Sequence, residues 1–80
     1  MRPINRIAGD IMRTWHRPYF GSVPYLQAML SLDNIDEDYG ADSARSVVLY
    51  FLSNATTWRG PDARRLKAEL KEPPRWVTGA

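Results

Sequence analysis

The absence of cysteine is the feature that most constrains this chain of 80 residues. Domains this small are usually stapled by disulfides or by metals bound to thiolates, and a chain without cysteine has neither. A chain of this length also buries only about 60 to 65% of the surface that its unfolded form exposes. The composition still supports a packed core, since 44% of the residues are hydrophobic and three are tryptophan. We therefore expect a small domain held together by packing alone, in a reducing compartment.

Apolar residues at helical spacing, interrupted by proline and glycine, divide the chain into four segments. The pattern predicts helices over Pro3–Trp15, over Val23 to about Asp33, from Asp42 or Ser43 to Trp58, and over Pro61 to about Glu72. The turn over residues 58–61 is short, so the last two helices should be neighbours. The predicted fold is all-α, a compact bundle of about four helices, with a single domain over residues 1–72 and a C-terminal tail over residues 73–80.

The helix ends carry recognisable signals. Ser22 is placed to cap the second helix, and Asp42 or Ser43 to cap the third. Gly60 is the expected terminator of the third helix, and Pro61 the expected first residue of the fourth. Residues 34–42 are predicted to form a surface loop with Ile35 as its anchor.

The predicted core is centred on the third helix, where Val48, Phe51 and Leu52 should be among the most buried side chains. Met12 lies in the apolar stripe of the first helix. Four clustered aromatic residues are also expected in the core, the alternative being a recognition patch for a peptide or a base: Trp15, Tyr19, Phe20 and Tyr25. The second and third helices are apolar around more of their circumference than a four-helix monomer easily covers, which favours a symmetric homodimer.

Acidic residues are concentrated in one segment: residues 1–32 sum to +3, residues 33–42 to −5 and residues 43–80 to +4. Asp36 and Asp38 resemble the start of a calcium loop. That motif requires glycine at its sixth position and glutamate at its twelfth, where this chain has Ala41 and Val47. We interpret the segment as a solvated loop, and expect no metal and no cofactor.

Catalysis has little support in the sequence. His16 is the only histidine, and a lone histidine at a helix end more often lies in solvent than acts as a base. We therefore expect a protein that is not an enzyme. The longest apolar run, Val47–Leu52, is far below the about 20 residues that span a bilayer, and no basic start followed by an apolar run marks a signal segment. We expect a cytoplasmic protein with no membrane partner.

A row of cations on the fourth helix is the predicted partner-binding site: Arg59, Arg64, Lys67 and Lys71. Spacings of three and four residues place the last three on one exposed flank, which should contribute little to folding. Arg65 and Glu69 are expected to pair on the same helix. The row suits an acidic protein surface or a phosphate backbone. A DNA-binding helix-turn-helix fits poorly, because aligning Gly60 with the turn glycine places charged residues at core positions.

Three segments, residues 19–29, 42–52 and 57–60 with 63–65, resemble short proteins encoded by bacteriophages and other mobile elements of Gram-positive bacteria. The resemblance spans most of residues 4–71 and carries over no activity and no site residue. It implies a small non-enzymatic protein that binds one macromolecule of the host or the phage. We therefore expect a protein that binds and modulates a host or phage protein, or alternatively a nucleic-acid-binding regulator that uses the basic face of the fourth helix.

Overall fold

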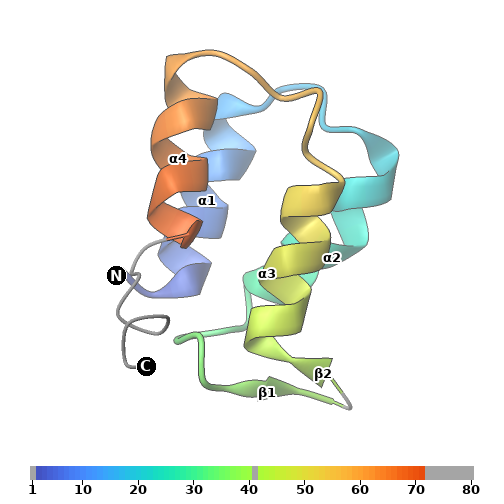
Figure 1. The fold of residues 1–80 in the computed structure, drawn as a ribbon, viewed down its shortest axis with the longest axis vertical. Coiled ribbons are helices and arrows are strands. Elements are labelled where there is room, and N and C mark those ends of the chain that lie inside the picture. Colours follow the sequence, from blue (N-terminus) through green and yellow to red (C-terminus); the bar gives the residue numbers. More distant parts are fainter. Residues whose placement is uncertain (1, 41, 72–80) are drawn as a thin grey trace.

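The computed structural model describes residues 2–40 and 42–71, so the predicted tail over residues 73–80 lies outside the described residues (Figure 1). These residues form four α-helices: α1 (Ile4–Thr14), α2 (Val23–Met29), α3 (Ala44–Ser53) and α4 (Pro61–Lys71). A short 3-10 helix, η1 (Phe20–Ser22), precedes α2, and two strands, β1 (Asp38–Tyr39) and β2 (Asp42–Ser43), precede α3. The prediction of a compact, mostly helical fold is confirmed, whereas the strand pair corrects the all-α prediction.

The strand pair replaces part of the predicted loop over residues 34–42. The strands are antiparallel, with Asp38 opposite Ser43. Gly40 has a φ of 59°, a left-handed backbone conformation that glycine adopts without steric cost, and this lets the chain reverse between the strands. The Ala44 N–H then donates to the Glu37 carbonyl at 2.7 Å. Ile35 packs partly buried against the core, as predicted.

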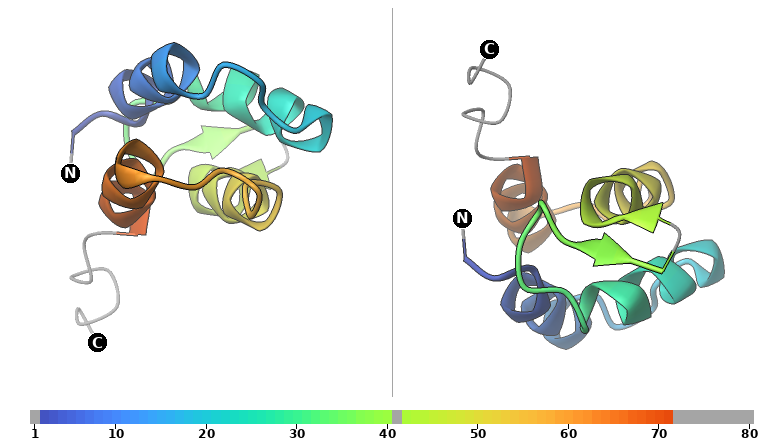
Figure 2. Two further views of the ribbon diagram at one scale, coloured as in Figure 1. Left: turned by 90° about the horizontal axis from the view of Figure 1, so that it is seen from above. Right: turned by 90° about the horizontal axis from the view of Figure 1, so that it is seen from below.

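The helices form two layers, with α1 and α2 in one layer and α3 and α4 in the other (Figure 2). Across the layers, α1 packs against α4, and α2 packs against α3 (Figure 1). The last two helices are neighbours within one layer, as expected, but each packs more closely against a helix of the other layer. That expectation rested on a turn of a few residues, whereas α3 ends at Ser53 and residues 54–60 carry the chain across to α4.

Two helices end earlier than their apolar patterns predict. The chain leaves α2 after Met29, and the carbonyls of Leu32 and Asp33 accept hydrogen bonds from the N–H groups of Asn5 and Ile4, each at 2.9 Å. The first N–H groups of any helix lack a partner within the helix. Leu32 and Asp33, which were predicted to lie in the second helix, therefore supply hydrogen-bond acceptors to the start of α1.

The third helix ends at Ser53 because Asn54 competes with the helical backbone. The Asn54 side-chain amide donates to the Tyr50 carbonyl at 2.9 Å, and its backbone N–H donates to the Phe51 carbonyl at 2.9 Å. At the other end of α3, Ser43 is the cap, and its Oγ accepts a hydrogen bond from the Ser46 N–H at 3.1 Å.

Ser22 does not cap α2, in contrast to the prediction. Its side chain is buried, and its Oγ donates to the Tyr19 carbonyl at 2.7 Å. The hydroxyl therefore forms no capping hydrogen bond with the first turn of α2. Pro24, in that turn, has no N–H to donate.

The core runs through both layers, and its fully buried side chains include Ile7, Met29, Val48, Phe51 and Leu66. The predicted burial of Val48 and Phe51 is confirmed, while Leu52 is only partly buried. Met12 and two of the four clustered aromatic residues, Tyr19 and Phe20, are exposed, so their predicted core placement is wrong. Both residues lie in the connector between α1 and α2.

Candidate binding site

The fourth helix is held firmly on the core along one side. Ala63, Leu66 and Leu70 are its buried residues, as their spacing predicts. Pro61 is its first residue, and Gly60 before it has a φ of 109°, which favours glycine. The predicted row of cations lies on a flank of the helix next to this buried side.

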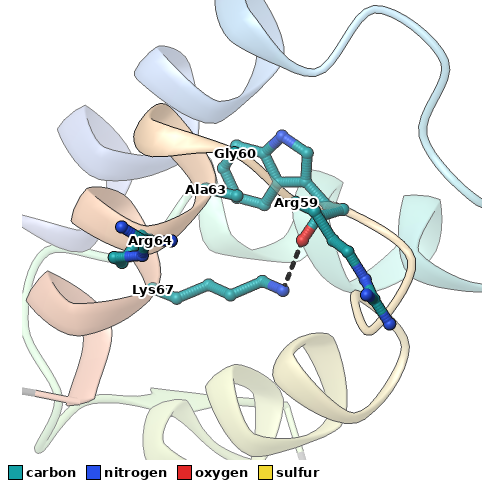
Figure 3. Close-up of a pocket in the computed structure, with 6 residues that line it drawn as sticks. Arg59, Gly60, Ala63, Arg64 and Lys67 are labelled. Carbon is teal, nitrogen blue, oxygen red and sulfur yellow. Dashed lines mark hydrogen bonds between the residues drawn. The ribbon is translucent and has the colours of Figure 1, made fainter.

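A surface pocket of about 240 Å³ opens where the connector over residues 54–60 meets the first turns of α4 (Figure 3). Its lining is Trp58, Arg59, Gly60, Ala63, Arg64 and Lys67. The structure thus brings three of the four predicted site residues together. Lys71 is exposed one turn further along α4 and does not belong to the lining. We call these four cations, with the Trp58 wall, the basic surface.

Lys67 departs from the predicted solvent-facing row. Its Nζ donates to the Trp58 carbonyl at 2.7 Å and lies 5.8 Å from the centre of the Trp58 ring (Figure 3). Partial burial lowers the pKa of Lys67, and the positive charges of Lys71 and Arg59 lower it further. Lys67 therefore stabilises the fold, because its hydrogen bond links the connector over residues 54–60 to α4.

The two remaining cations of the pocket, Arg59 and Arg64, are exposed and form no ion pair with the described residues. Because Arg59, Arg64 and Lys67 all line it, the pocket concentrates positive charge. Guanidinium groups in such a position bind carboxylates and phosphates through paired hydrogen bonds. The pocket is therefore suited to an anionic group.

The acidic residues of α4 point away from the pocket. Asp62 pairs with Arg65 at 3.3 Å. Glu69 accepts two hydrogen bonds from Arg2, at 2.6 and 2.8 Å, and these lower the Glu69 pKa. The predicted Arg65–Glu69 pair is thus replaced by two other pairs, and neither acid neutralises Arg59 or Arg64 directly.

Sequence reasoning missed Trp58 as a wall of the site. Its apolar character placed it in the core, and it is indeed buried, stacked on Trp15 with ring centres 5.2 Å apart. Its carbonyl, in the connector after α3, accepts the hydrogen bond from Lys67.

The other residues considered for chemistry lie apart from this site. His16 is exposed and lines a second pocket of about 180 Å³, whose further lining is apolar except for Gln27. In the acidic segment, Asp36 pairs with Arg45 at 3.3 Å and Glu37 accepts the Asp33 N–H at 2.8 Å. Within residues 2–40 and 42–71, no group of three or more acidic or histidine side chains is arranged to hold a metal ion.

No family model, curated protein or solved structure matches the chain. Among the described helices, none is long and apolar enough to cross a membrane.

Proposed function

We propose that this chain is a small non-catalytic protein of a phage or mobile element that acts in the host cytoplasm by binding an acidic surface of a host or phage protein. The observation that carries the proposal is the pocket that Arg59, Arg64 and Lys67 line together with Trp58. Modulation of the partner follows from occupation of that acidic surface.

An acidic protein surface fits this site better than a phosphate backbone. Phosphate backbones are bound through many evenly spaced cations, and each contact steepens the dependence on salt. Here Lys67 is engaged with the Trp58 carbonyl, which leaves Arg59 and Arg64 beside the pocket and Lys71 beyond it. Two guanidinium groups at one pocket suit a single carboxylate on a protein surface.

The test is a charge reversal that spares Lys67. In the variant Arg59→Glu/Arg64→Glu, both exposed guanidinium groups of the pocket are replaced. The matched control, Arg6→Glu/Arg17→Glu, changes the net charge equally and also combines one arginine early in a helix with one in a connector. Tagged protein is used to capture partners from nuclease-treated lysate of a Gram-positive host. We expect the pocket variant to lose the captured protein and the control to retain it.

The same two variants address the nucleic-acid alternative. They are titrated with a short DNA duplex and a matching single strand over a range of salt concentrations. Tight binding that falls steeply with salt and is lost only in the pocket variant would replace the proposed protein partner with nucleic acid. Equal capture by both variants would reject the basic surface as the binding site. A homodimer, as the sequence predicts, would present two basic surfaces to one partner.

A further inference from the structure

Two long segments of the chain, residues 18–32 and 46–58, contain no Asp, Glu, Lys or Arg, although 25% of all residues are charged. The first includes η1 and α2, and the second includes most of α3. In the fold, α2 and α3 pack directly against each other (Figure 1). The residues on the outer surface of the α2–α3 pair are therefore almost all uncharged.

Exposed apolar side chains gather on this uncharged pair. Of six large hydrophobic residues that are exposed in the described chain, five belong to the two uncharged segments: Tyr19, Phe20, Leu30, Leu49 and Tyr50. Phe20 is 80% exposed, which is extreme for an aromatic side chain in a small domain. Exposed apolar residues that lie singly need no explanation, but a continuous patch of them is typical of an interface.

The two uncharged segments hold two pairs of aromatic rings, and one of the four, Tyr25, is partly buried against the core. The rings of Tyr19 and Phe20 have centres 5.0 Å apart, and those of Tyr25 and Tyr50 have centres 5.5 Å apart. Gly21 links the two pairs, because a side chain at this position would meet both the Tyr19 ring and the Asn54 amide. The Asn54 amide in turn donates to the Tyr50 carbonyl at 2.9 Å. We call Tyr19, Phe20, Tyr25 and Tyr50 the aromatic surface.

We propose that two copies of this chain associate through their aromatic surfaces, which face each other across a two-fold axis. A two-fold contact places each residue of a patch opposite the same patch in the other copy, so a charged patch would repel itself. The residues of segments 18–32 and 46–58 carry no charge, and this repulsion is absent. A strongly charged partner would find no complementary group among them.

The available area also fits a second copy. Each aromatic side chain carries about 150 to 250 Å² of surface. The exposed parts of the four rings therefore supply roughly half of the about 800 Å² that each partner contributes to a typical stable interface. Neighbouring exposed residues of the same segments, such as Pro24 and Ser53, are uncharged and extend the patch. Tyrosine is favoured at interfaces because its ring is apolar and its hydroxyl can stay in water.

The dimer would leave the basic surface free. Figures 1 and 2 place η1 and the start of α2 at the side of the molecule away from α4. The proposed association thus goes beyond the proposed function and does not depend on it.

The experiment compares substitutions to glutamate at two positions in the aromatic surface with one outside it. Phe20→Glu is the main variant, because Phe20 is so exposed that the change removes little packing. Tyr50→Glu is the second. Met12→Glu is the matched control, since Met12 is 51% and Tyr50 is 49% exposed and both lie in the last turns of a helix. Sedimentation velocity from low to high micromolar concentration measures the dimer, and circular dichroism checks the fold.

We expect a dimer in the unmodified chain, a dissociation constant raised at least tenfold by Phe20→Glu and by Tyr50→Glu, and no change with Met12→Glu. If the Tyr50→Glu variant unfolds because it loses the contact with Tyr25, the Phe20→Glu variant alone tests the proposal. A monomer throughout the concentration range overturns the proposal, as does a dimer that Phe20→Glu leaves intact or that Met12→Glu weakens equally. The Arg59→Glu/Arg64→Glu variant should dimerise normally, so failure of the proposed function is recognised separately.

Discussion

The two helix pairs bury equally apolar interiors and differ sharply in their outer surfaces. The α1–α4 pair buries Ile7 and Leu66 completely, and the α2–α3 pair does the same with Met29 and Phe51. Outside, α1 and α4 carry many charged residues, whereas α2 carries none and α3 carries only Arg45. The core therefore gives little information about function. The exposed sides define a charged half, formed by α1 and α4, and an uncharged half, formed by α2 and α3.

The two halves are joined through three aromatic residues. Trp15, which follows α1, stacks on Trp58 with an angle of 11° between the ring planes, and meets Phe51 of α3 edge to face at 6.2 Å. The contrast between the halves therefore concerns their surfaces, while the fold depends on contacts shared by both. The largest predicted effect follows from breaking these contacts.

Phe51→Ala should unfold both halves together. The side chain is completely buried and meets Trp15, so its removal leaves a cavity and should lower the free energy of unfolding by about 3 to 5 kcal/mol. That loss is comparable to the whole stability of many small domains. Urea denaturation followed by circular dichroism measures it. Leu49→Ala, at a half-exposed position of the same helix, is the control and should cost less than about 1 kcal/mol. Similar losses for both variants would contradict the central position of Phe51.

Lys67→Met should have an intermediate effect, because it loosens the connector between the halves. The substitution removes the donor to the Trp58 carbonyl and keeps an apolar stem of similar length. A hydrogen bond from a charged group at a partly buried site suggests a loss of about 1 to 2 kcal/mol. Lys71→Met, at an exposed position of the same helix, should cost less than about 0.5 kcal/mol. Thermal denaturation of both variants compares them, and equal shifts would show that the Trp58 contact contributes nothing.

This difference between Lys67 and Lys71 corrects the expectation that the whole cation row contributes little to folding. Helical spacing places residues on a common face, and it does so correctly for Arg64 and Lys67. It gives no information on what the end of a long side chain contacts across the fold. The lysine stem reaches a carbonyl nine residues earlier in the chain, in the connector between α3 and α4.

Local signals in the sequence predicted the starts of helices better than their ends. Ser43 and Pro61 mark helix starts by short-range chemistry, and both were predicted. The ends at Met29 and Ser53 were not predicted. The first depends on hydrogen bonds to the start of α1, a contact between distant segments, and the second on the side chain of Asn54, which also suits a helix interior facing solvent.

Exposure of the aromatic residues could not be predicted from their clustering. Trp15 and Tyr19 are only four residues apart, yet Trp15 is in the core and Tyr19 is at the rim. The position of each ring depends on where the chain turns after α1, which the pattern of apolar residues does not specify. The same pattern did indicate that the second and third helices have more apolar surface than their neighbours cover, and this excess is found on Leu49 and Tyr50.

The smallest predicted effect is a pH dependence confined to the charged half. Hydrogen bonds from Arg2 lower the Glu69 pKa in the folded protein, so the stability that this pair contributes is fully present above the ordinary pKa of glutamate. It is lost as the pH falls through the lowered pKa of the folded state, where Glu69 becomes protonated. Glu69→Gln should therefore cost about 0.5 kcal/mol at neutral pH, a value typical of partly exposed ion pairs, and almost nothing in strong acid. Urea denaturation at both pH values measures the difference. In an Arg2→Gln background the same substitution should lose its pH dependence, and a dependence that persists there would assign it to a group other than this pair.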